Sequence, residues 1–260
     1  MMEEKKNQTK VIASVEKAIR VLMIVARSQN GMSVTEISRE LGGGISATYH
    51  LLNTLRQSDM LQQDAQSKKY TIGVGVFRLH ALAQRQNTLA GAAQPELDAL
   101  CRETGETSNL AVLEDKETIY VAQTESSSMV KMFTQIGARV PYYCTGGGKV
   151  ILAFLPKETQ LEYASSTRFA PFTKHTVHNK TELLHELETI RAQGFGYDRE
   201  EREEGVLCIA APVFDAAGKP VAAMSISGPA YRLEQKGIDE MTAAVCAHAK
   251  ALSQRLGAAI

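Results

Sequence analysis

The stretch Tyr142–Phe154, with the sequence YYCTGGGKVILAF, combines a glycine run, a lysine and an apolar helical segment. Such a run can bind phosphate, but a phosphate-binding loop needs Gly, four residues, then Gly-Lys-Ser/Thr. Here Tyr143 stands five residues before Gly148, and a valine follows Lys149, so both fixed positions fail. Thr145 can still cap a helix that begins in the glycines, which leaves backbone N–H groups to meet an anion. The alternative is that the glycines let the helix pack closely on a neighbour.

Three other groups of side chains could do chemistry. The four cysteines form no C-x-x-C pair, which argues against a disulfide framework or a zinc ribbon: Cys101, Cys144, Cys208 and Cys246. The run Asp198–Gly205, DREEREEG, offers carboxylates for acid–base or metal chemistry, but such a run is typical of a solvated loop. His175, His178 and His185 lack the cysteine or carboxylate spacing of a closed zinc site. We therefore expect neither a metal nor a cofactor.

Charge divides the chain into two different parts. The 260 residues are 44% apolar and 22% charged, enough for one large domain or two ordinary ones. Through Gln86, 12 basic and 7 acidic residues give a net charge of +5, which leaves −5 for the remainder. This asymmetry suggests a nucleic-acid-binding module joined to a part with a different partner. The N-terminus MMEEKKNQTK has no apolar signal-peptide core, so we expect a cytoplasmic protein.

The basic first part has the pattern of a winged helix-turn-helix. Ser14 can cap a first helix, Ser33-x-x-Glu36 has the form of a capping box for a second, and a third starts near Ser46 after three glycines. The polar segment 64–68 between two extended runs predicts a hairpin wing whose lysines contact DNA phosphates. The candidate DNA contacts are Ser33, Thr35, Ser46, Ala47, Thr48, Tyr49, His50, Asn53, Lys68 and Lys69. A three-helix module for protein interaction is the alternative.

The remainder predicts a linker helix and an α+β domain. Residues 75–86 carry Val76, Leu79 and Ala83 at helical spacing, which suits either pairing of two DNA-binding heads or packing on the same chain. The expected strands do not alternate regularly with helices along the chain. This order favours an antiparallel sheet flanked by helices, which is an α+β fold. Extended segments are expected at Thr107–Leu113, Thr118–Gln123, Val130–Gln135, Val206–Phe214 and Val221–Ser227. If the turn 215–218 pairs its outer residues, Cys208 lies opposite Ser225, on the face that Ser227 shares.

Three motifs in this order resemble the IclR family of bacterial transcriptional regulators: SVTEISRELGGGISATYHLLNTLRQSDMLQQDAQSKKYTIG, GARVPYYCTGGGKVILAFL and GYDREEREEGVLCIAAPVFDAAGKPVAAMSISGP. The resemblance covers nearly the whole chain. It implies a winged helix-turn-helix domain over 1–74, a linker helix over 75–87 and a GAF-like effector-binding domain over 88–260. It also implies homodimers or homotetramers on palindromic double-stranded operators. The effector contacts that it implies are Gly146, Gly147, Asp198, Cys208, Ser225 and Ser227.

The resemblance indicates a regulator, more often a repressor, controlled by a small organic acid such as a sugar acid or keto acid. The alternatives for the carried-over residues are ordinary sheet hydroxyls for the serines and a plain core thiol for Cys208. A thiol-dependent enzyme fused to an interaction module is the second hypothesis, with Cys144 or Cys208 as nucleophile, but no local Cys/His arrangement supports it. The chain departs from the family pattern at Gly43, Gly44, Ile45 and His50, which leaves its operator sequence open.

Overall fold

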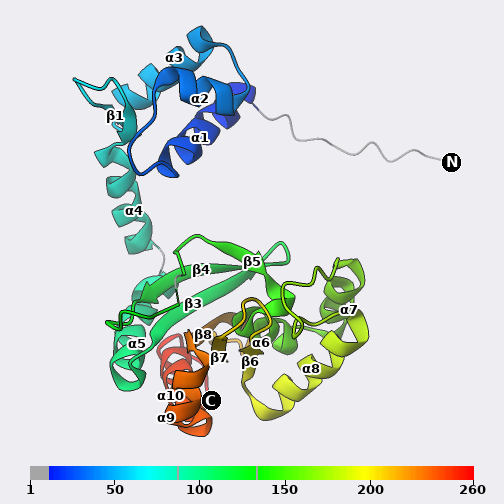
Figure 1. Cartoon of the computed structure of the whole chain (residues 1–260). Coiled ribbons are helices and arrows are strands. Elements are labelled where there is room, and N and C mark those ends of the chain that lie inside the picture. Colours follow the sequence, from blue (N-terminus) through cyan, green and yellow to red (C-terminus); the bar gives the residue numbers. More distant parts are fainter. Residues whose placement is uncertain (1–11, 87, 133) are drawn as a thin grey trace, which may run out of the picture. The chain divides into compact units, whose positions relative to one another are not determined.

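The computed structural model describes residues 12–86, 88–132 and 134–260 (Figure 1). The chain divides into two compact units, Met1–Gln86 and Asn87–Ile260. Within the described residues, no helix combines the length and the apolar character needed to cross a membrane.

The first unit is a three-helix module with a small hairpin. Its elements are α1 (Ala13–Ala26), α2 (Val34–Leu41), α3 (Ile45–Gln57), β1 (Leu61–Gln63), β2 (Tyr70–Ile72) and α4 (Val74–Gln86). Val21 and Val25 of α1, Ile37 of α2 and Leu52 of α3 meet in one buried core. The apolar spacing along each helix produces this arrangement, because residues three and four apart share a helix face.

Local signals fix where these helices begin and end. Ser33 caps α2 as predicted: its side chain accepts from Glu36 N–H, and the Glu36 carboxylate accepts from Ser33 N–H at 2.8 Å. Gly42 ends α2 with a φ of 70°, in the left-handed region that favours glycine. The predicted cap at Ser14 is wrong, because α1 begins at Ala13 and Ile12 occupies the cap position without a side-chain bond.

The hairpin between β1 and β2 matches the predicted wing. Leu61 pairs with Ile72 and Gln63 with Tyr70 in antiparallel register. The Asp64 carboxylate accepts from Ser67 N–H at 2.7 Å, and Lys68 adopts a φ of 57°, which closes the turn and leaves Lys68 exposed.

The second unit is a six-stranded antiparallel sheet with helices on both faces (Figure 1). The strand order is β5-β4-β3-β8-β7-β6. The strands are β3 (Thr107–Glu114), β4 (Glu117–Thr124), β5 (Arg139–Pro141), β6 (Gly196–Arg199), β7 (Val206–Phe214) and β8 (Pro220–Pro229). The helices are α5 (Thr88–Thr104), η1 (Tyr142–Cys144), α6 (Gly146–Phe154), α7 (Lys157–Ser166), α8 (Lys180–Gln193), α9 (Ala230–Lys236) and α10 (Ile238–Arg255). The predicted α+β class with an antiparallel sheet is confirmed.

Strand alternation divides the core into two layers. Met224 and Ile226 of β8 pack in the cluster that α5 and α10 cover, whereas Ala223 packs in the cluster of α6 and α8. Small side chains on the second face let α6 approach the sheet closely. A β-carbon added at Gly147 would lie 3.6 Å from the β-carbons of Ala111 and Ala223.

Two predictions about the sheet are wrong. The described part of 130–135 is not a strand, and the edge strand is instead the three-residue β5. Cys208 lies opposite Ser227, not Ser225. One cause is the turn, which is one residue longer than expected because Asp215 N–H donates to the Lys219 carbonyl. The other is a bulge between Val213 and Phe214. Each feature shifts the register by one residue. Together they shift it by two, so Cys208 stays on the predicted face.

Candidate DNA-binding surface and ligand pocket

The exposed start of α3 forms the centre of the candidate DNA-binding surface. A recognition helix must expose its first residues to DNA, and those exposed here are Ser46, Ala47, Tyr49 and His50. Thr48 does not fit its predicted role, because it is only 1% exposed and its hydroxyl donates to the Gly44 carbonyl at 3.0 Å.

The other predicted DNA contacts lie at the edges of this surface. Thr35 is exposed on α2, while the Ser33 hydroxyl donates to the Glu36 carboxylate as part of the cap. Asn53 is half-buried and accepts a hydrogen bond from Arg56 at 3.1 Å. Of the wing lysines, Lys68 is exposed, whereas Lys69 is half-buried.

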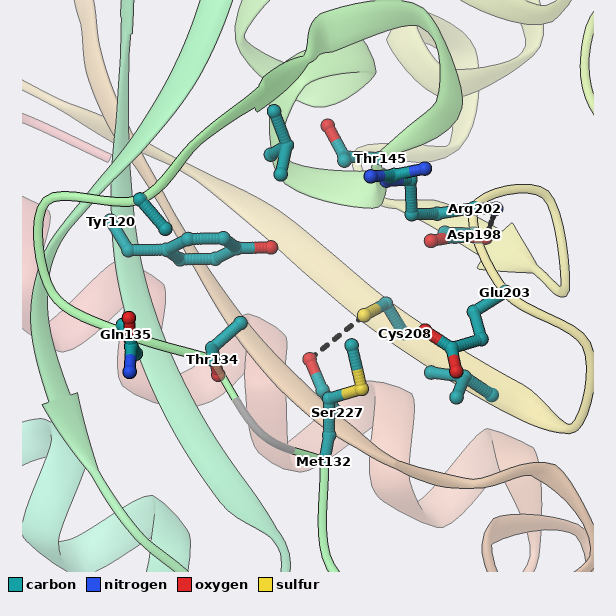
Figure 2. Close-up of a pocket in the computed structure, with 13 residues that line it drawn as sticks. Tyr120, Met132, Thr134, Gln135, Thr145, Asp198, Arg202, Glu203, Cys208 and Ser227 are labelled. Atoms are coloured by element: carbon teal, nitrogen blue, oxygen red, sulfur yellow. Dashed lines mark hydrogen bonds between the residues drawn. The ribbon is translucent and has the colours of Figure 1, made fainter. Parts of the chain in front are cut away.

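A pocket of about 250 Å³, with both polar and apolar side chains in its lining, opens on the α6 side of the sheet. Its size lies just below the range of about 300–1,000 Å³ typical of sites for drug-sized ligands, so it suits a small metabolite. Thirteen residues line it: Tyr120, Met132, Thr134, Gln135, Ala138, Val140, Thr145, Asp198, Arg202, Glu203, Val206, Cys208 and Ser227. Figure 2 shows the Tyr120 hydroxyl, Ser227, Cys208, Asp198 and Arg202 around one shared space.

The structure brings together three of the six residues that the resemblance implied. Asp198, Cys208 and Ser227 line the pocket, and the Cys208 sulfur lies 2.8 Å from the Ser227 hydroxyl. Ser225 does not line it, although it is buried on the same face two residues earlier.

Gly146 and Gly147 do not line the pocket either. A β-carbon at Gly146 would lie 3.3 Å from the backbone nitrogen of Asp198, so the packing alternative describes these glycines. The start of α6 reaches the pocket through Thr145, whose hydroxyl accepts from Gly148 N–H at 3.3 Å and caps the helix as predicted.

The lysine of the GGGK run is not available to a ligand. Lys149 is 0% exposed, and its ammonium donates to the carboxylates of Glu186 and Glu201. Burial alone would lower the pKa of Lys149, but the two carboxylates outweigh burial and raise it.

The expectation of a solvated loop holds for only part of the acidic run: Arg199 and the segment 203–205 are exposed, whereas Asp198 and Glu201 are buried. Asp198 is 4% exposed and accepts from Glu201 N–H at 2.7 Å, and Glu201 is also buried. Burial raises the pKa of Asp198 to about 6 and that of Glu201 to about 7, because the charged forms lose their hydration. Within the described residues, one oxygen of Glu201 is buried without a hydrogen-bond partner.

Arg202 is a pocket residue that the sequence did not single out. Its guanidinium stacks on the Phe172 ring at 4.0 Å and forms no ion pair with another described residue. Arg199, three residues earlier, stacks on Tyr197 at 4.1 Å and does not line the pocket. No sequence signal distinguishes these two arginines, because both lie in the same charged run.

The two candidate nucleophilic thiols, of which Cys208 lines the pocket, are poor nucleophiles. Burial raises the pKa of Cys144 and that of Cys208 to about 12, so the reactive thiolate is scarce near neutral pH. Among the residues that the structure describes, no three His, Cys, Asp or Glu side chains group as a metal site would require.

The winged helix-turn-helix of the first unit defines a DNA-binding protein, and comparison with known proteins specifies the kind. The profile described as "Bacterial transcriptional regulator IclR C-terminal" matches residues 80–254, and "IclR helix-turn-helix domain" matches residues 14–65. The chain belongs to the IclR family of bacterial transcriptional regulators, which is a family of DNA-binding regulators and not of enzymes.

Individual relatives agree with this membership. The transcriptional repressor AllR of Salmonella typhimurium is 35% identical over 244 residues, which cover 94% of this chain and 90% of the relative. The regulator KdgR of Dickeya chrysanthemi is 32% identical over 246 residues, covering 95% of this chain and 80% of the relative. The crystal structure of Thermotoga maritima IclR superposes with a TM-score of 0.83 at 30% identity, covering 94% of this chain and 99% of that one.

Proposed function

We propose that this protein is a cytoplasmic transcriptional repressor whose operator affinity is set by a small organic acid, such as a sugar acid or keto acid, bound in the pocket of the second unit. The observation that carries the proposal is Arg202. Its guanidinium borders the pocket and has no ion-pair partner among the described side chains, so it can bind a ligand carboxylate in bidentate fashion.

The other polar side chains suit the rest of such a ligand. The Ser227 and Thr145 hydroxyls can donate to or accept from ligand oxygens, and the Asp198 carboxylate can accept from a ligand hydroxyl. Tyr120, Met132 and Val206 supply apolar surface for the carbon atoms of such a ligand. A hydroxylated or keto acid of a few carbons would satisfy both kinds of group. The name of the relative AllR, a repressor, supports the direction of control.

We further propose that the protein acts as a homodimer or homotetramer on a palindromic operator. Ile12, Val15, Ile19 and Met23 are exposed at helical spacing on the side of α1 away from its buried Val21 and Val25. On α4, Phe77, Leu79 and Leu82 are also exposed. A second copy that covers these side chains would pair two α3 helices for two operator half-sites. The effector would then act through different affinities for two arrangements of the paired heads.

A thermal-shift screen of the full-length protein tests the pocket assignment. Gluconate, glucuronate, pyruvate and 2-oxobutyrate would be screened against wild type, Arg202→Gln and the matched control Arg199→Gln. We expect an acid that raises the melting temperature of the wild type and of the control but not of Arg202→Gln, because a ligand that binds the native state stabilises it. The same acid should weaken binding to operator DNA. If no acid gives a shift that depends on Arg202, the pocket is not the effector site.

A further inference from the structure

The recognition helix α3 carries no permanently charged side chain before its last turn. From Ile45 to Leu55 it contains no Lys, Arg, Asp or Glu, and the first basic residue of the helix is Arg56, in its last turn. Guanine is most often read in the major groove by the bidentate donors of Arg or Lys. That contact is not available from the exposed start of this helix.

Two large apolar side chains occupy the same region. Ile45 is 55% exposed and Tyr49 is 53% exposed. They lie four residues apart, so they are neighbours along one side of the helix. Leu52 and Leu55 form the core side of α3; Ile45 and Tyr49 lie beside this stripe, yet each remains more than half exposed.

The position of Ile45 and Tyr49 indicates which group on DNA they would contact. The N-terminal residues of a recognition helix contact base edges, and Ile45 is the first residue of α3. On the major-groove edge of B-DNA, the C5-methyl group of thymine is the one apolar group that a base presents. Among base edges, such methyl groups are therefore the groups against which Ile45 and Tyr49 could bury apolar surface in the groove.

We propose that Ile45 and Tyr49 are specificity-determining residues that read thymine C5-methyl groups, so that each operator half-site has thymines at the positions facing the start of α3. The proposal rests on the DNA-binding function proposed above and specifies which bases the protein selects. His50 and Asn53, on the adjoining positions, remain the polar candidates for neighbouring bases.

Replacing thymine by uracil removes the methyl group and nothing else, which makes the test direct. A duplex is first selected from a random library with the full-length protein and then resynthesised with each thymine changed singly to uracil. The dissociation constant of every duplex is measured by fluorescence anisotropy for wild type, Ile45→Ala, Tyr49→Ala and the control Gln57→Ala. All three replaced side chains are exposed, and circular dichroism would confirm that each variant folds.

We expect one or more single uracil changes in each half-site to weaken wild-type and Gln57→Ala binding about fourfold, the factor that burial of one methyl-sized group gives. The same change should have no effect on the variant that lacks the contacting side chain. Uracil-insensitive binding by the wild type overturns the proposal, and so does a loss that persists unchanged in both Ile45→Ala and Tyr49→Ala. If the wild type shows no salt-sensitive binding to any library duplex, the DNA-binding function fails as well, which separates the two failures.

Discussion

Replacing Lys149 by methionine should destabilise the second unit more than any surface substitution. Methionine fills a similar volume but leaves the buried Glu201 without its cation, and Glu186 without its buried partner. Removing one member of a buried ion pair typically costs about 3–5 kcal/mol, because the remaining charge is desolvated and unpaired. Since Glu201 is 92% buried by side-chain area, the loss should lie within that range rather than near zero.

The dependence on pH identifies the cause. Lys149 lowers the pKa of Glu201, so its removal raises that pKa further above about 7. The folded variant then holds a proton that the unfolded chain releases at the ordinary pKa near 4.5, and its stability falls as pH rises through this interval. The loss should therefore be larger at pH 8 than at pH 5.5. The double variant Lys149→Met/Glu201→Gln should recover part of it, because glutamine carries no charge to desolvate.

Urea denaturation of the full-length protein, followed by far-UV circular dichroism, would measure these losses. The matched control is Lys157→Met, whose partner Glu188 is as exposed as the lysine itself, and it should show no measurable loss. A loss below about 1 kcal/mol for Lys149→Met, or one that is equal at both pH values, would show that the buried cluster does not stabilise the fold as argued.

Other substitutions test other parts of the structure. Gly148→Ala should destabilise by about 1–3 kcal/mol, because the new β-carbon would lie 2.6 Å from the Tyr142 backbone, whereas Gly147→Ala, with 3.6 Å available, should be neutral or slightly stabilising by thermal melting. In the wild type, the folded pKa of Asp198, about 6, lies above the ordinary 3.8, so the free energy of unfolding should fall by up to about 3 kcal/mol as pH rises from about 4 to 7. Asp198→Asn should remove this fall. Urea denaturation across this pH range would contradict the prediction if the free energy of unfolding of wild type and variant changed equally with pH. Ile19→Glu should shift the full-length protein to smaller assemblies in sedimentation velocity, while Glu16→Gln on the same helix should not; an unchanged assembly would remove α1 from the proposed interface.

Local signals explain why most elements could be predicted. Ser33 and Thr145 each cap the helix expected from them, since a side-chain oxygen three residues before an N–H is a property of a short sequence. The extended segments expected on either side of Asp115 and Lys116 are likewise present as β3 and β4, which these two residues join at positive φ. These features depend on neighbours in the chain, which the sequence contains directly.

Features that depend on residues far apart in the sequence were harder to predict. The turn after Asp215 and the bulge beside Val213 together move Ser227 opposite Cys208. Pro212 is a local sign of a bulge in this inner strand, but it does not say how far the register shifts. The burial of Glu201 depends on Lys149, 52 residues earlier, and a charged run shows no sign of a partner so far away. The pocket could therefore be predicted as a face of the sheet, but not as the set of side chains that line it.

The buried cluster and the pocket are parts of one structure. Glu201 is held by Lys149 through its carboxylate, and its backbone carbonyl accepts from the Thr176 hydroxyl at 2.6 Å. The next two residues, Arg202 and Glu203, line the pocket, and Arg202 N–H also donates to the Asp198 carboxylate at 3.4 Å. Because the buried contacts of Glu201 fix the backbone at this point, the side chains of the next two residues have little freedom where they line the pocket. The ion pairs of Lys149 thus help to hold the backbone next to Arg202, the residue that we propose binds the ligand carboxylate.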